Sequence, residues 1–236
     1  FRYDSVHGRF PGKVTLEGGR KITGRFVMLA TGSSPRRIPG FEFDEKEVLS
    51  STGALMLERL PKSLLVLGGG FIGVELAYVF NAFGVDVTIV EMLDKILPPE
   101  DDDTTAVVHK AFESRGVRIL TATKAVGLNR KAPSRLEVML EDKTGKTSSL
   151  SVEKILVAVG RAPNTDGLGL ETAGIAPEKG FVPVGDFYQT KAPGLFAVGD
   201  IVNAPQLAHV ASKEAEIAVE FMGGRRPEPR VNLNAI

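Results

Sequence analysis

A glycine-rich turn between a buried strand and an amphipathic helix is the feature that most limits what this chain can fold into. Leu64–Leu67 is a continuous apolar run, typical of a strand covered on both faces of a parallel sheet. Phe71–Phe83 carries apolar residues at helical spacing. Between them, Gly68-Gly69-Gly70-Phe71-Ile72-Gly73 fits the pattern G-x-G-x-x-G in the strand–helix context that a dinucleotide site requires. The sequence therefore predicts an α/β fold of Rossmann type.

Each part of this motif meets a separate physical need. Gly68 permits the tight turn, Gly70 lets the backbone approach a pyrophosphate, and Gly73 lets the helix pack closely on the strand. Glu91 ends the second buried strand, and its carboxylate could accept both hydroxyls of an adenosine ribose. Residues 92–94 include no arginine that could accept a 2′-phosphate, so NAD(H) is favoured over NADP(H). The alternative is a glycine-rich turn followed by an incidental acid.

Strand–helix alternation continues through the middle of the chain. A second strand is expected at Asp86–Val90, a helix from Asp101 to Gly116, and a third strand at Val117–Leu120. We interpret the acids at 101–103 as helix caps rather than as a metal site. Three segments without helical period, 124–128, 136–140 and 147–150, predict a small antiparallel meander. A further buried strand is expected at 155–159.

The two ends of the chain have a different character. The first sixty residues are expected to be strand-rich, with a hairpin turning at Gly18-Gly19 and a loop at Thr31–Pro35 because of its glycine and proline. The last part is expected to contain turns over 180–193, a short strand at 195–198 and a helix at about Leu207–Met222. We therefore predict three regions: a strand-rich region at 1–60, a dinucleotide-binding domain at 61–178, and a region of turns, a short strand and a helix at 179–236.

Composition limits the other functions that the chain could have. The 29 basic and 29 acidic residues balance, which gives no electrostatic reason to expect nucleic acid or an anionic membrane as a partner. The chain has no cysteine, so it contains no disulfide, thiolate metal site or cysteine nucleophile. His7, His109 and His209 are too far apart to suggest a metal cluster. We expect no metal, nucleic acid or membrane as a ligand.

The motifs together resemble those of the pyridine nucleotide–disulfide oxidoreductases, most of all the dihydrolipoamide dehydrogenases. The matching pieces come in that family's order: Ala30–Ser33, Gly68–Glu75, Gly160–Asn164, Gly194–Asp200 and Gln206–His209. The resemblance covers nearly all of residues 13–224. It implies a three-layer Rossmann-like NAD-binding domain with a small meander, flanked by parts of an FAD-binding domain.

The resemblance also implies roles for individual residues. For NAD they are Gly68, Gly69, Gly70, Phe71, Ile72, Gly73, Glu75, Glu91, Ala125 and Gly160. For FAD they are Thr31, Gly32, Ser33, Asp200, Gln206, Leu207, Ala208 and His209. Other interpretations stay open: Glu75 as a favourable charge at a helix N-terminus, Asp200 as the acid of a plain turn, and His209 as a packing residue.

The chain departs from the family pattern at both ends. Such enzymes begin with another βαβ unit for FAD and a C-x4-C cysteine pair, and they end with an interface domain that carries a catalytic His-Glu pair. The resemblance therefore implies a central fragment with no catalytic residue of its own, inactive alone and with its FAD lost. The whole enzyme would oxidise dihydrolipoamide through its disulfide and FAD and would form NADH. It would be a homodimer that meets lipoyl-bearing acyltransferase subunits, in the cytoplasm or an organelle matrix.

Two alternatives to this function remain. One is another flavoprotein disulfide reductase, such as a mercuric or glutathione reductase, or a soluble transhydrogenase. Glu91 argues against an NADP-dependent reductase, and Gln206–His209 argues against NADH oxidases and thioredoxin reductases. The other is a stand-alone, non-catalytic NAD(H)-binding module or redox sensor. The first segment makes the module less expected, because it lacks the apolar faces needed to close its own core.

Overall fold

The computed structural model describes residues 2–5, 12–16, 18–132 and 135–233. It forms two compact units: an outer unit of Phe1–Ser34 with Ala162–Ile236, and an inner unit of Pro35–Arg161. The predicted region boundaries, after residues 60 and 178, differ from these. Residues 48–49 form a strand that pairs inside the inner unit, so the chain enters this unit well before its glycine motif.

The inner unit is built on a five-stranded sheet in the order β6-β13-β7-β8-β9, in which all neighbours are parallel. The strands are β6 (Val48–Leu49), β13 (Lys154–Val157), β7 (Ser63–Leu67), β8 (Asp86–Val90) and β9 (Arg118–Leu120). Three helices follow strands of this sheet: α1 (Ser51–Leu55), α2 (Phe71–Ala82) and α3 (Asp102–Ser114). The predicted Rossmann-like alternation is confirmed.

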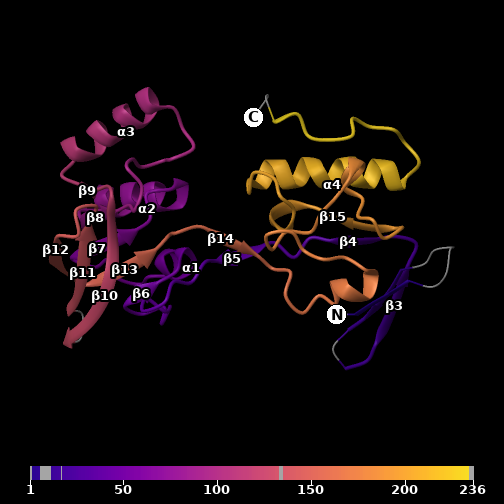
Figure 1. Ribbon diagram of the computed structural model, residues 1–236, viewed down its shortest axis with the longest axis horizontal. Coiled ribbons are helices and arrows are strands. Elements are labelled where there is room, and N and C mark those ends of the chain that lie inside the picture. Colours follow the sequence, from indigo (N-terminus) through magenta and orange to yellow (C-terminus); the bar gives the residue numbers. More distant parts are fainter. Residues whose placement is uncertain (1, 6–11, 17, 133–134, 234–236) are drawn as a thin grey trace. The chain divides into compact units, whose positions relative to one another are not determined.

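Each face of the sheet packs against a different layer (Figure 1). Leu64 and Val66 of β7 face a core shared with α2 and α3, whereas Leu65 and Leu67 face a core shared with the antiparallel meander. The meander consists of β10 (Thr123–Ala132), β11 (Arg135–Asp142) and β12 (Thr147–Val152). Both faces of β7 are therefore buried, which explains its unbroken apolar sequence.

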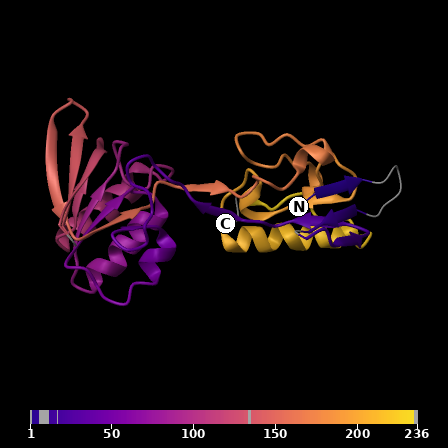
Figure 2. The same ribbon diagram turned by 90° about the horizontal axis from the view of Figure 1, so that it is seen from below.

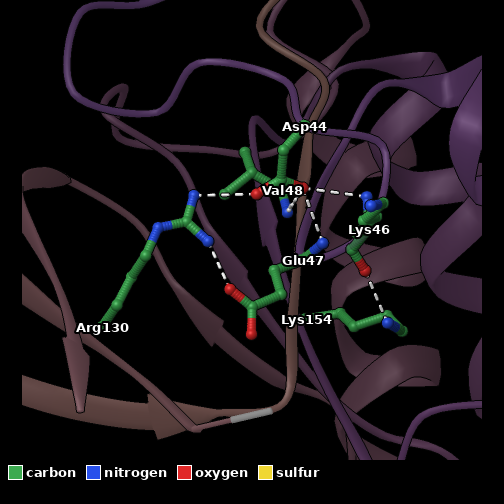
Figure 3. A network of polar contacts seen from close by, with 6 residues as sticks. All are labelled: Asp44, Lys46, Glu47, Val48, Arg130 and Lys154. Carbon is green, nitrogen blue, oxygen red and sulfur yellow. Dashed lines mark hydrogen bonds and ion pairs between the residues drawn. The ribbon is translucent and has the colours of Figure 1, made fainter. Parts of the chain in front are cut away.

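A charged network ties the meander to the segment before β6 (Figure 3). Arg130 of β10 pairs with Asp44 at 2.8 Å and also with Glu47. Burial opposes the ionisation of Asp44, but backbone N–H groups of residues 46–48 and the Arg130 guanidinium lower its pKa to about 2. The Asp44 carboxylate thus acts as a fixed acceptor for a tight turn.

The described part of the outer unit includes a three-stranded sheet, a two-stranded parallel sheet and a long helix. One sheet is antiparallel and consists of β1 (Arg2–Ser5), β2 (Gly12–Thr15) and β3 (Lys21–Gly24). Strands β2 and β3 form the hairpin predicted at Gly18-Gly19. β4 (Val27–Leu29) pairs in parallel with β15 (Leu195–Ala197). Helix α4 (Ala208–Met222) packs on β15 through Ile217 and Phe196. Figure 2 shows this helix lying along one side of the strands of the outer unit. The first segment thus obtains its core from the last part of the chain.

One local prediction is wrong, and another is confirmed only in part. Residues Ser33–Pro35 form strand β5, which pairs with β14 (Arg161–Pro163), rather than a loop. Proline is tolerated there because it is the last residue of a short strand at a sheet edge. As predicted, Asp101 is the N-cap of α3, and Asp102 and Asp103 lie in its first turn. The Asp101 side chain makes no capping hydrogen bond, however, and Asp102 pairs with Lys95 at 2.6 Å.

Short 3-10 turns complete the outer unit: Leu170–Ala173, Asp186–Tyr188 and Gly199–Ile201. Within the described ranges, no group of three or more acidic or histidine side chains could hold a metal ion. No helix in this part of the chain has the length and apolarity needed to cross a bilayer.

Candidate functional site

Two glycines of the turn after β7 are needed by the fold itself. Gly68 has a φ of +105°, and a Cβ there would lie 2.4 Å from the carbonyl oxygen of Ala158. A Cβ on Gly73 would lie 2.0 Å from the carbonyl oxygen of Gly68. Both contacts are with backbone atoms, which cannot move aside as a flexible side chain could. Helix α2 can therefore start this close to the sheet only with glycine at both positions.

Gly70 is different, because its surroundings are open. It is the N-cap of α2, with φ −75° and ψ −177°, and a Cβ there would meet nothing within 4 Å. The backbone conformation alone does not require glycine. The first N–H groups of an α-helix have no partner within the helix and carry a partial positive charge. The open space at Gly70 therefore lies where an anion could approach the backbone.

Glu91 is buried beside this turn and contacts it directly. Its Oε2 accepts a hydrogen bond of 2.6 Å from the Gly69 N–H, and its Oε1 accepts one of 2.8 Å from the Leu93 N–H. A carboxylate offers about four lone-pair sites, so acceptor capacity remains for ligand hydroxyls. The sequence predicted the position of Glu91 at the strand end but not its bond to the glycine turn.

An open cavity of about 540 Å³ lies beyond Glu91, at the carboxyl ends of β8 and β9. Its walls combine the apolar side chains of Met92 and Leu93 with an ion pair between Lys124 and Glu141 at 2.8 Å. The other lining residues are Asp94, Ala122, Thr123 and 142–145. The carboxyl edge of a parallel sheet is the usual ligand side of such folds, which is the signal that could have predicted this cavity.

The remaining residues predicted for NAD also lie in the inner unit. Phe71 and Glu75 are exposed on the first turns of α2, whereas Ile72 is half-buried against the helical core. Ala125 packs against the core under the meander. Gly160 has a φ of +106°, and its carbonyl accepts a hydrogen bond of 2.9 Å from the Arg36 N–H.

The residues predicted for FAD lie in the outer unit, and three of them are brought together. The Ser33 hydroxyl donates to Asp200 Oδ2 at 2.5 Å, and Gln206 Nε2 donates to the Asp200 carbonyl at 3.4 Å. Thr31 and Gly32 bind a different residue, Asn164. Leu207, Ala208 and His209 are exposed at the start of α4.

Asn164, the last residue of a matched motif, and Glu214 are polar residues for which the sequence predicted no role. The Asn164 side chain donates to the Thr31 carbonyl at 2.9 Å and accepts from the Ser34 hydroxyl at 2.7 Å. Glu214 of α4 is 1% exposed, and its Oε2 accepts from the Gly199 N–H at 2.7 Å. Burial raises the pKa of Glu214. An acid on an apolar helix face was the available sequence signal.

A family model described as "Pyridine nucleotide-disulphide oxidoreductase" matches residues 2–215. The chain is 39% identical to dihydrolipoyl dehydrogenase of Bacillus subtilis over 95% of its length and 43% identical to that of Thermus scotoductus over 92%. It spans about half the length of these relatives, 48% in both cases. The crystal structure of LpdA from Mycobacterium tuberculosis matches with a TM-score of 0.86 at 30% identity, covering 100% of this chain and 51% of that one.

Proposed function

Because this chain belongs to the pyridine nucleotide-disulphide oxidoreductase family, we propose that its inner unit is the NAD(H)-binding domain of a flavoprotein oxidoreductase. The observation that carries this proposal is the arrangement around Gly70. An open backbone position at a helix N-terminus stands next to a buried carboxylate, and a cavity follows at the carboxyl edge of the sheet. These three features suit a pyrophosphate, a ribose diol and an adenine in that order.

Each part of the dinucleotide would meet a distinct group. The pyrophosphate would accept hydrogen bonds from backbone N–H groups at Gly70 and the start of α2. Glu91 would accept hydroxyl protons from the adenosine ribose with its remaining lone pairs. A 2′-phosphate at the same place would meet the negative charge of Glu91, which favours NADH over NADPH.

For the whole protein we propose the activity after which its relatives are named, that of a dihydrolipoyl dehydrogenase. Ser33 and Asp200 of the outer unit offer a hydroxyl and a carboxylate suited to the ribityl chain of FAD. Bound FAD would supply hydride transfer to NAD⁺. The thiol step needs cysteines, of which this chain has none, so the chain alone would be inactive. Its residues supply only part of the FAD site, so the chain alone would also lose FAD and be colourless. The dimer and the lipoyl-bearing acyltransferase partners belong to this proposal for the whole protein.

Titration calorimetry of the purified chain with NADH and with NADPH tests the nucleotide proposal. We expect NADH to bind at least ~10-fold more tightly, which is about 1.4 kcal/mol. Equal affinities, or no binding of either nucleotide, would contradict it. Flavin absorbance in the purified chain, or NADH formation from dihydrolipoamide, would contradict the expected inactivity.

A further inference from the structure

Gly69 is held by two hydrogen bonds and has little room for a side chain, although the glycine pattern allows any residue at its position. Its N–H donates to Glu91 Oε2 at 2.6 Å, and its carbonyl accepts from the Leu97 N–H at 2.7 Å. A Cβ on Gly69 would lie 2.8 Å from Cγ2 of Ile96, which is fully buried. The backbone of Leu97 adopts a φ of +48°, which is uncommon for leucine.

These contacts fix both peptide planes that flank Gly69. In a trans peptide the C=O and the following N–H point in opposite directions. Because the Gly69 carbonyl points at Leu97, the N–H of Gly70 points away from Leu97. Because the Gly69 N–H points at Glu91, the carbonyl of Gly68 points away from Glu91, and it lies where Gly73 leaves it room. The orientation of the turn is therefore set before any ligand binds.

We propose that Glu91 and Leu97 are positioning residues for the pyrophosphate-binding turn, so that Glu91 acts on dinucleotide affinity through Gly69 as well as through the ribose. This inference rests on the proposed NAD(H) site. It changes the expected role of Glu91. An acid that only recognised the ribose would matter only to nucleotides whose ribose hydroxyls it contacts. An acid that also orients the turn matters to every ligand that places a pyrophosphate there.

Replacing Glu91 by glutamine separates the two roles chemically. Ribose hydroxyls can donate or accept, so an amide can still bind both of them. The N–H groups of Gly69 and Leu93 can only donate, and an amide has a single oxygen to accept from them. Glu91→Gln therefore leaves one backbone N–H facing an NH₂ group, and the turn must shift. Asp86→Asn is the matched control, since it removes one negative charge from the exposed start of the same strand.

The binding test uses NADH and NADPH with the wild-type chain, Glu91→Gln and Asp86→Asn. We expect Glu91→Gln to weaken NADH by roughly tenfold, the equivalent of about 1.4 kcal/mol. NADPH should also be weakened, but by less, because its 2′-phosphate no longer meets a negative charge, and Asp86→Asn should weaken neither nucleotide. Loss of NADH affinity with NADPH unchanged or tighter would overturn the proposal, because it would assign Glu91 to the ribose alone. Circular dichroism establishes that each variant is folded.

Amide hydrogen exchange without ligand tests the positioning role separately from nucleotide binding. In the wild-type chain we expect the Gly69 and Leu93 amides to be protected. In Glu91→Gln at least one of them should exchange on the order of tenfold faster, with β7 unchanged. Equal exchange at both amides in the two proteins would overturn the positioning role. If neither nucleotide binds but exchange changes as expected, the proposed NAD(H) function fails while the contact between Glu91 and the turn stands.

Discussion

Two alanine substitutions within one glycine motif should have opposite consequences. Gly73→Ala would place a Cβ 2.0 Å from the carbonyl oxygen of Gly68, so α2 must move away from β7. Overpacking of a well-packed core costs about 1–3 kcal/mol, and a clash between backbone atoms should cost at least the upper end of that range. Gly70→Ala meets nothing within 4 Å. Alanine lowers the conformational entropy of the unfolded chain, which stabilises the fold, but it is a weaker N-cap than glycine, which destabilises it. The net effect of Gly70→Ala on the free energy of unfolding should therefore stay within about 1 kcal/mol.

The assay is urea denaturation followed by circular dichroism, together with NADH titration of each variant. We expect Gly73→Ala to lower the unfolding midpoint strongly. Gly70→Ala should keep the midpoint and lose at least ~10-fold in NADH affinity, because its methyl group fills the space proposed for the pyrophosphate. The reasoning is refuted if the two variants are equally stable, or if Gly70→Ala binds NADH as the wild type does.

Further predictions concern charged side chains and the dependence of stability on pH. The folded-state pKa of Asp44, about 2, lies below its ordinary value, so its contribution to stability is present above the ordinary value and lost as pH falls toward 2. Arg130→Met should destabilise the chain by on the order of 1 kcal/mol at neutral pH, since the pair is partly exposed, and unfolding in urea at pH 7 measures this. For Glu214 burial raises the pKa, so its contribution is greatest below the ordinary value and is lost as pH rises through the folded-state pKa. Thermal unfolding from pH 4 to pH 8 should therefore show a steeper loss in the wild type than in Glu214→Gln, and parallel curves would contradict this.

Periodicity predicted the strands and helices of the inner unit from residue 64 onward well, although not the unit's boundaries, because the signals for those elements are local in the sequence. An apolar run such as Leu64–Leu67 has few uses other than a strand buried on both faces, and the helix and turn signals next to it agree. The position of Glu91 followed from the same pattern, since strand ends meet at one edge of a parallel sheet. The family membership was likewise accessible from the order of the motifs.

What the sequence could not predict depends on contacts between distant segments. Ser33–Pro35 pairs with residues more than a hundred positions later, so its glycine and proline signals pointed to a loop. The bond from Gly69 to Glu91 requires the turn and the strand end to be placed in three dimensions. Glu214 stands on the apolar face of its helix, but this signal alone does not reveal its burial or its hydrogen bond from the Gly199 N–H.

The hydrogen bond between Arg36 and Gly160 has a consequence for how this architecture can be rearranged. These residues lie next to the first and last positions of the inner unit, 35 and 161, so the unit begins and ends at neighbouring points. A segment whose two ends meet can be inserted into, or removed from, another chain without stretching either junction. The inner unit is therefore suited to exchange as one continuous segment. Grafts that exchange residues 35–161 between relatives should transfer nucleotide preference while leaving the rest of the host protein unchanged.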